Sequence, residues 1–143
     1  DVIYPSGDMF DYEPKFYLPF KGITQPIYAI PGNHDWFNAL DAFAANFFTP
    51  ESARAAIEAR VDADHHLSST TDERVADLIA EAGRLRDAYR IRNGLQNAPW
   101  FEVRTDDFAF IAVDTGILRK LDPLQMAWFR AALERSMYPP RWS

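Results

Sequence analysis

The segment Gly32-Asn33-His34-Asp35 follows directly on the apolar run from Ile27 to Pro31, and it constrains the fold of this chain more than any other feature. A second pattern, Gly7-Asp8, follows the residues Val2-Ile3-Tyr4. Each pattern indicates a short strand that ends in a loop carrying polar side chains. Ligands bind where the strands of a parallel α/β sheet end. The two patterns therefore predict that their polar side chains converge on one site.

The composition narrows the class of protein. A chain of 143 residues that is 48% hydrophobic suits one globular domain with a substantial core. The sequence contains no cysteine, which excludes disulfides and thiolate metal sites. The formal net charge of -6 argues against a broad basic face, so no nucleic-acid partner is expected. No apolar run approaches the roughly 18 residues of a membrane span, so no membrane segment is expected either.

Apolar runs bounded by turn residues predict the strands. We expect them over Val2–Gly7, Ile27–Ile30, Trp100–Thr105 and Phe108–Asp114. The last two runs meet at Asp106-Asp107, which indicates a hairpin. Because the final run is almost entirely apolar, we expect it to be a central strand.

Helical spacing of apolar residues predicts four helices. They span Trp36–Phe48, then Pro50–Val61 with Thr49 as N-cap, then a long segment from the capping box Thr70/Glu73 to Asn93-Gly94, and finally Asp122 to about Arg135. In the last helix we expect Leu124, Trp128, Ala131 and Ala132 to face inward. The polar stretch from Asp62 to Thr71 is interpreted as a loop.

Asp8, Asn33 and His34 are the candidate site residues. The Asp8 carboxylate has two interpretations, a bridging metal ligand or a turn and helix cap, and the nearby Gly-Asn-His-Asp segment favours the metal. Asn33 offers a neutral amide oxygen, which suits hard or borderline cations. His34 follows it directly and is better placed as a proton donor to a leaving oxygen.

Other acidic residues are more ambiguous. Asp11 is either a carboxylate that orients His34 and raises its pKa or a solvated turn acid, and both interpretations stay open. Asp35 has the same two interpretations, but a helix N-cap is its preferred role. The stretch from Asp62 to His66 carries acidic and histidine side chains, but adjacent histidines point in different directions, so a solvated loop is preferred. Asp114-Thr115-Gly116 ends a central strand and is therefore a candidate to approach the site, but the preferred interpretation of Gly116 is a turn residue.

Three segments of the sequence resemble the calcineurin-like metallophosphoesterase superfamily, in its non-protein-phosphatase branch. They are Gly7-Asp8-x-x-Asp11, then Gly32-Asn33-His34-Asp35 with its preceding strand, and the run from Phe110 to Gly116 followed by Gln125-x-x-Trp128. The resemblance covers both ends of the chain. Residues 51–97 carry no motif of the family and are interpreted as a helical insertion.

The resemblance implies an α/β fold, part of a sandwich of two mixed sheets flanked by helices. It implies a centre of two divalent metal ions, commonly Mn, Fe, Zn or Ni. Asp8 would bridge the metals, Asn33 would bind one of them, and His34, with Asp11, would be catalytic. A metal-bound hydroxide would attack the phosphorus of a phosphomono- or diester substrate.

The family also has an Asp-x-His motif before the Gly-Asp strand and a Gly-His-x-His motif near its end. In this sequence no Asp-x-His motif precedes Gly7-Asp8 and no Gly-His-x-His motif is present, and its histidines are His34, His65 and His66. We therefore expect residues 1–143 to form a single partial domain of a hydrolase, inactive by itself. The alternative is a scaffold or binding domain that keeps the fold without a complete metal site.

Overall fold

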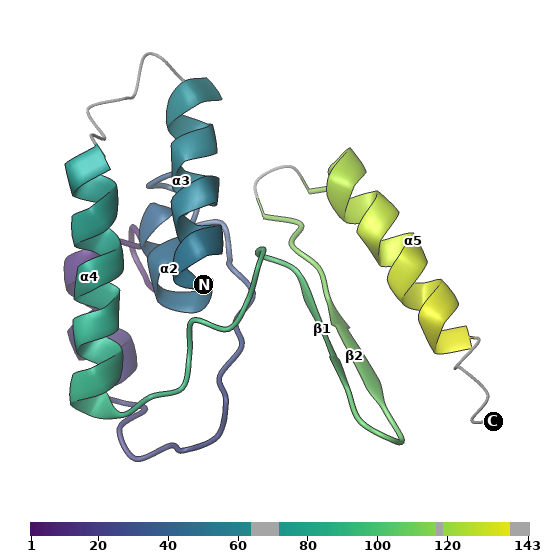
Figure 1. Ribbon diagram of the computed structural model, residues 1–143, viewed down its shortest axis with the longest axis horizontal. Coiled ribbons are helices and arrows are strands. Elements are labelled where there is room, and N and C mark those ends of the chain that lie inside the picture. Colours follow the sequence, from purple (N-terminus) through teal and green to yellow (C-terminus); the bar gives the residue numbers. More distant parts are fainter. Residues whose placement is uncertain (64–71, 117–118, 138–143) are drawn as a thin grey trace.

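The computed structural model describes residues 1–63, 72–116 and 119–137, which form a mixed fold of helices and strands. The elements are α1 (Met9–Tyr12), the π-helix η1 (Glu13–Tyr17), α2 (Asp41–Phe47), α3 (Pro50–Ala63), α4 (Asp72–Tyr89), β1 (Phe101–Arg104), β2 (Ala109–Ala112) and α5 (Pro123–Met137). Figure 1 shows the helices up to α4 gathered in one group, while β1, β2 and α5 lie beside them. We call residues 1–99 the helical half and residues 100–137 the hairpin half. Within the described ranges, no helix is long and apolar enough to cross a membrane.

The core lies in the helical half. Helices α2, α3 and α4 contact one another, and η1 packs against α4. Four aromatic rings of this core contact one another in edge-to-face or tilted pairs: Tyr12, Phe16, Phe43 and Phe47. The helices interpreted as an insertion contribute Ile57, Val75 and Leu85 to the same core cluster as the N-terminal Ile3. The segment 51–97 is thus part of the core that supports the two motif loops.

The strands expected over Val2–Gly7 and Ile27–Ile30 are absent from the structure. Side chains satisfy their backbone groups in place of a sheet ladder. The carboxylate of Asp35 accepts the N–H groups of Val2 and Ile3. The buried Gln96 side chain accepts the N–H of Ala29 at 2.8 Å and donates to its carbonyl at 3.0 Å, as a neighbouring strand would. A single parallel bridge joins Pro26 to Arg92 in this region.

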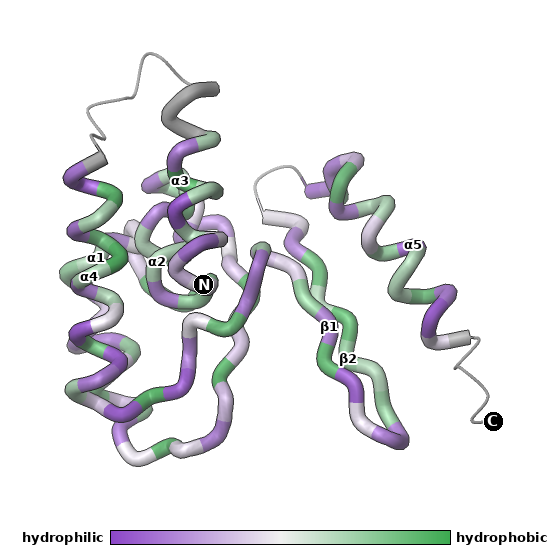
Figure 2. The backbone as a smooth tube through the Cα atoms, in the orientation of Figure 1, coloured by the Kyte–Doolittle hydropathy of each residue, from purple (hydrophilic) through white to green (hydrophobic). Residues whose placement is uncertain are grey.

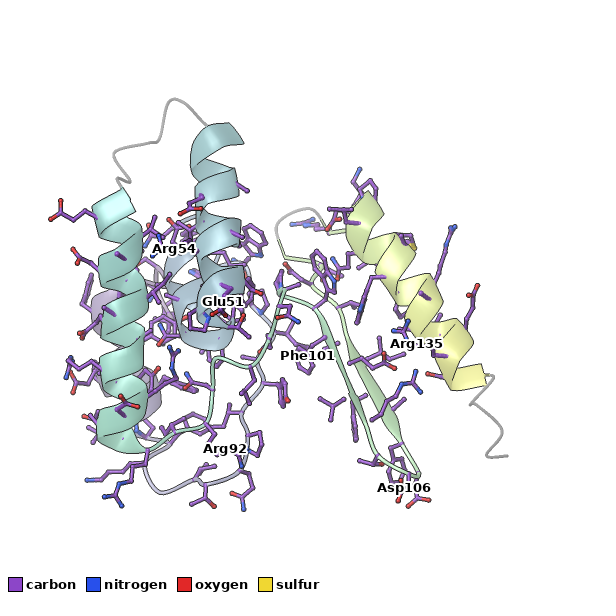
Figure 3. The ribbon with its side chains drawn as sticks, viewed as in Figure 1. Glu51, Arg54, Arg92, Phe101, Asp106 and Arg135 are labelled. Carbon is purple, nitrogen blue, oxygen red and sulfur yellow. The ribbon has the colours of Figure 1, made fainter. Side chains whose placement is uncertain are left out.

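The hairpin prediction is confirmed. Strands β1 and β2 pair in antiparallel register, from Phe101 opposite Ala112 to Arg104 opposite Ala109. Helix α5 covers one face, where Arg104 donates to the Ala132 carbonyl and Arg135 pairs with Glu102. Figure 3 shows Arg135 on the side of α5 that faces the hairpin. The described residues form this one two-stranded sheet, so β2 is not central and no two-sheet sandwich is present.

The helix predictions were right where a side chain caps the first turn. Thr49 accepts the N–H of Ser52 before α3, and Asp122 accepts those of Leu124 and Gln125 before α5. Thr70 lies outside the described residues. The inward prediction for Leu124 was wrong, because this side chain is exposed on the first turn of α5.

Two helix boundaries were also wrong, because left-handed residues interrupt the predicted helices. Ala39 and Leu40 have φ of 53° and 66°, so α2 begins at Asp41 rather than near Trp36. Arg90, with φ of 56°, ends α4 before the Asn93-Gly94 pair. Residues other than glycine rarely adopt this conformation, so their sequence gave no stop signal.

Candidate functional site

The two motif loops lie against each other, backbone to backbone. Gly7 has φ of +66°, and a Cβ atom there would lie 3.0 Å from the Asp35 Cα and 3.2 Å from the His34 carbonyl oxygen. Both the left-handed conformation and the close approach require glycine at this position. The loop that carries Asp8 and the loop that carries His34 therefore form a single surface at one side of the helical half.

Asp35 connects the segments that form this surface. Its buried carboxylate accepts the N–H groups of Val2 at 2.8 Å and Gly32 at 2.9 Å through Oδ2, and that of Ile3 at 3.0 Å through Oδ1. The first of these partners is 33 positions away in the chain. The N-cap interpretation of Asp35 was wrong, because Leu40 precedes α2. Asp35 instead joins the first residues of the chain to the Gly-Asn-His-Asp loop.

Asp8 is half-buried, and its carboxylate has two partners in neighbouring turns. Oδ2 accepts the hydroxyl of Ser6, and Oδ1 accepts the amide of Asn38, which also donates to the Ser6 carbonyl at 3.0 Å. Asp8 occupies the N-cap position of α1 but makes no capping hydrogen bond with its side chain. Sequence analysis did not single out Asn38, which orients Asp8 and follows the second motif by three residues.

The His34 ring is held by a backbone carbonyl and two aromatic rings. Nδ1 lies 2.6 Å from the Pro5 carbonyl oxygen, and because a carbonyl can only accept, Nδ1 carries a proton. The ring centroids of Tyr4 and Phe37 lie 4.4 Å and 4.6 Å away. This arrangement leaves Nε2 as the nitrogen that can exchange a proton with a ligand.

Asp11 pairs with Lys15, not with His34. Its carboxylate lies 2.8 Å from the Lys15 ammonium group, which also donates to the Tyr4 carbonyl at 2.7 Å. Tyr4 precedes the proline whose carbonyl holds His34. In the part of the chain that the structure describes, Asp11 therefore has no direct contact with His34. It holds Lys15, which in turn binds the segment whose Pro5 carbonyl orients the His34 ring.

Asn33 is exposed, and within the described part of the chain no hydrogen bond of its side chain is present. Its amide oxygen is accessible to a ligand from solvent. The convergence of the Asp8 and Asn33 oxygens on one ion stays a prediction.

The described residues do not form a complete two-metal centre. Across residues 1–63, 72–116 and 119–137, no group of three or more histidine, cysteine, aspartate or glutamate side chains is placed to hold a metal ion. Both oxygens of Asp8 are engaged by Ser6 and Asn38. The pair His65-His66, interpreted above as part of a solvated loop, lies outside the described residues.

Asp114, just after the end of β2, connects the hairpin half to the motif loops through Trp36. Its buried carboxylate accepts the indole N–H of Trp36 at 3.2 Å and the N–H of Gly116 at 2.8 Å. Burial raises the pKa of Asp114, the Gly116 and Trp36 hydrogen bonds oppose that rise, and the negative charge of Asp122 adds to it. The Gln125 side chain binds both backbone groups of Asp114, which fixes the strand end against α5. The strand end thus approaches the residue that directly follows the second motif.

Comparison of the chain with protein-family models, with curated proteins and with solved structures finds no match.

Proposed function

We propose that this chain carries part of the active site of a metal-dependent phosphoesterase that hydrolyses phosphomono- or diesters. The supporting observation is the direct contact of the two motif loops at Gly7 and Asp35, which sets Asp8 and His34 in one surface. In this proposal Asp8 and Asn33 are two of the ligands of a divalent-metal centre. The other ligands come from outside the described residues.

His34 is the proposed proton donor. Its protonated ring gives the Nε2 proton to the leaving oxygen as the bond from phosphorus to that oxygen breaks, and water supplies the new oxygen on phosphorus. The Pro5 carbonyl keeps a proton on Nδ1, so Nε2 is the nitrogen that acts. Asp11 is a positioning residue that works through Lys15 and the Tyr4 carbonyl.

Paired substitutions in the natural protein that contains these residues test the assignment. Asp8→Ala and Asn33→Ala are expected to weaken manganese binding, measured by calorimetry, together with turnover of p-nitrophenyl phosphate and its bis ester. His34→Ala is expected to keep the metal and to slow hydrolysis about a hundredfold or more. Asp107→Ala, at the exposed hairpin tip, is the control and should change neither quantity.

A second candidate function has one observation in its favour. Each oxygen of the Asp8 carboxylate accepts one hydrogen bond, from Ser6 or from Asn38, which is how a structural aspartate in a binding or scaffold domain would be held. That candidate predicts no metal-dependent turnover in the wild-type protein. It also predicts that Asp8→Ala lowers the stability of the fold and changes no metal affinity.

A further inference from the structure

A groove of about 430 Å³ opens beside Asp8. One part of its lining comes from the motif region, with Asp8 and Asn38, and another comes from α4, with Arg74 and Leu78. Phe10 and Phe37 supply two aromatic rings to the lining. The groove therefore combines apolar surface with acidic and basic groups next to the proposed catalytic residues.

The two aromatic rings are open to solvent. Phe10 is 76% exposed and Phe37 is 59% exposed, whereas the phenylalanines of η1 and α2 are buried in the core. Single exposed apolar residues need no explanation, but two aromatic rings lining one hollow are typical of a binding site. The ring of Phe37 also lies 4.6 Å from that of His34, so a ligand in the groove would lie beside the proposed proton donor.

We propose that this groove binds the aromatic leaving group of an aryl phosphoester. This inference rests on the proposed function and names its substrate class. The volume falls within the roughly 300–1,000 Å³ of small-molecule sites and accommodates a group of one or two rings. Phe10 and Phe37 offer the faces and edges against which a planar ring packs. Placing the leaving group there directs its ester oxygen toward the side of the groove that adjoins His34.

Binding of 1-naphthyl phosphate provides a test that does not depend on turnover. The titration is followed by amide chemical shifts in the wild-type protein, with inorganic phosphate as the ligand that lacks the ring. We expect 1-naphthyl phosphate to bind at least about tenfold more tightly than phosphate, and Phe10→Ala to remove most of that difference. Phe108→Ala is the matched control, because Phe108 is 65% exposed but lies at the hairpin.

Phe37 needs a gentler variant, because it also packs against His34. Phe37→Leu keeps an apolar side chain near the histidine, and it should weaken naphthyl binding less than Phe37→Ala does. Equal affinity for the two ligands, or wild-type affinity in Phe10→Ala, overturns the proposal. So does a self-association, measured by sedimentation, that Phe10→Ala abolishes, since a second copy would then occupy the groove.

Turnover separates this inference from the proposed function. If the protein hydrolyses 1-naphthyl phosphate and glycerol phosphate with equal kcat/KM, and Phe10→Ala leaves both unchanged, the groove proposal fails and the phosphoesterase stands. If 1-naphthyl phosphate binds through Phe10 but no ester is hydrolysed with added manganese, the phosphoesterase fails and the groove stands as a binding site for aryl phosphates.

Discussion

The helical half and the hairpin half both contain large aromatic residues, but many of these are buried in the helical half and two are exposed in the hairpin half. The aromatic side chains of η1 and α2 are buried in the helical core, whereas Phe108 and Phe110 of the hairpin are 65% and 61% exposed. Figure 2 shows hydrophobic stretches along both strands of the hairpin, and α5 covers only one face of it. Side chains alternate between the faces of a strand, so residues on the uncovered face stay in solvent. A residue's hydrophobicity thus predicts its burial only where a second layer is present.

Two side-chain contacts join the helical half to the hairpin half near the motif loops. The rings of Tyr28 and Phe101 lie 5.1 Å apart, and Trp36 donates to Asp114. Figure 3 places Phe101 at the end of the hairpin that meets the helical half, while Asp106 lies at the distant tip. The motif loops belong to the helical half, and the hairpin half reaches them through Asp114. The same kind of substitution made in each half can show how much more the side chains contribute to stability in one half than in the other.

The largest contrast is expected for one substitution made in both halves. Phe47 is buried against Tyr12, Phe16 and Phe43, so Phe47→Ala should lower the free energy of unfolding by about 3–5 kcal/mol through lost burial and a cavity. Phe110→Ala should change it by no more than about 0.5 kcal/mol. Urea denaturation followed by circular dichroism measures both. Similar losses would mean that the hairpin face is covered in solution, and the contrast would not hold.

The next effect concerns Asp35, which holds the start of the chain to the motif loop. Asp35→Ala leaves the N–H groups of Val2, Ile3 and Gly32 without their acceptor, and we expect a loss of about 2–4 kcal/mol. Asp106→Ala, an exposed aspartate of the hairpin tip, should cost no more than about 0.5 kcal/mol. Hydrogen exchange adds a local readout, because the amides of Val2 and Ile3 should exchange faster in Asp35→Ala. Unchanged exchange would show that another group secures this segment.

The contact between the halves should respond to pH through Asp114. Burial raises its pKa, so the folded state holds the proton more tightly than the unfolded state does. As pH rises from the ordinary value of 3.8 through the raised pKa, the unfolded state loses its proton first, and wild-type stability falls relative to Asp114→Asn. The asparagine keeps an acceptor oxygen for Gly116. Urea midpoints from about pH 4 to pH 8 measure the difference, with Asp107→Asn as control. Parallel curves for wild type and Asp114→Asn would contradict the prediction.

Sequence patterns correctly predicted structural features that depend on residues close together in the chain. Thr49 and Asp122 cap helices through backbone groups two or three positions away, and the hairpin follows from two β runs joined at Asp106-Asp107. Strand predictions near the motifs failed because side chains distant in the chain replaced the ladder. Gln96 serves Ala29 from 67 positions away, a contact that no local pattern indicates.

Sequence patterns predicted that the two motif loops meet, but they did not predict how the candidate side chains on those loops are oriented. The motifs identified Asp8 and His34, and their loops do meet. The group that orients His34 is the Pro5 carbonyl, a backbone acceptor that has no signature in the sequence. Asn38 and the groove lining depend on the left-handed turn at Ala39 and Leu40, which the helix prediction passed over. The sequence thus supplied the candidate residues, whose chemistry stays a prediction, while the geometry around them depends on tertiary contacts.

The smallest expected effect concerns a buried hydroxyl group in the core of the helical half. The Tyr12 hydroxyl is buried and has no hydrogen-bond partner among the described residues, whereas the Tyr17 hydroxyl donates to Asn46 at 2.7 Å and accepts from Asn93. Tyr12→Phe removes an unsatisfied polar group, so it should leave stability unchanged or raise it by up to about 1 kcal/mol. Tyr17→Phe breaks satisfied bonds and should cost about 1–2 kcal/mol. Urea denaturation of both variants gives the comparison. An equal loss for Tyr12→Phe would contradict the prediction, because it would mean that the hydroxyl is satisfied by a partner such as a bound water.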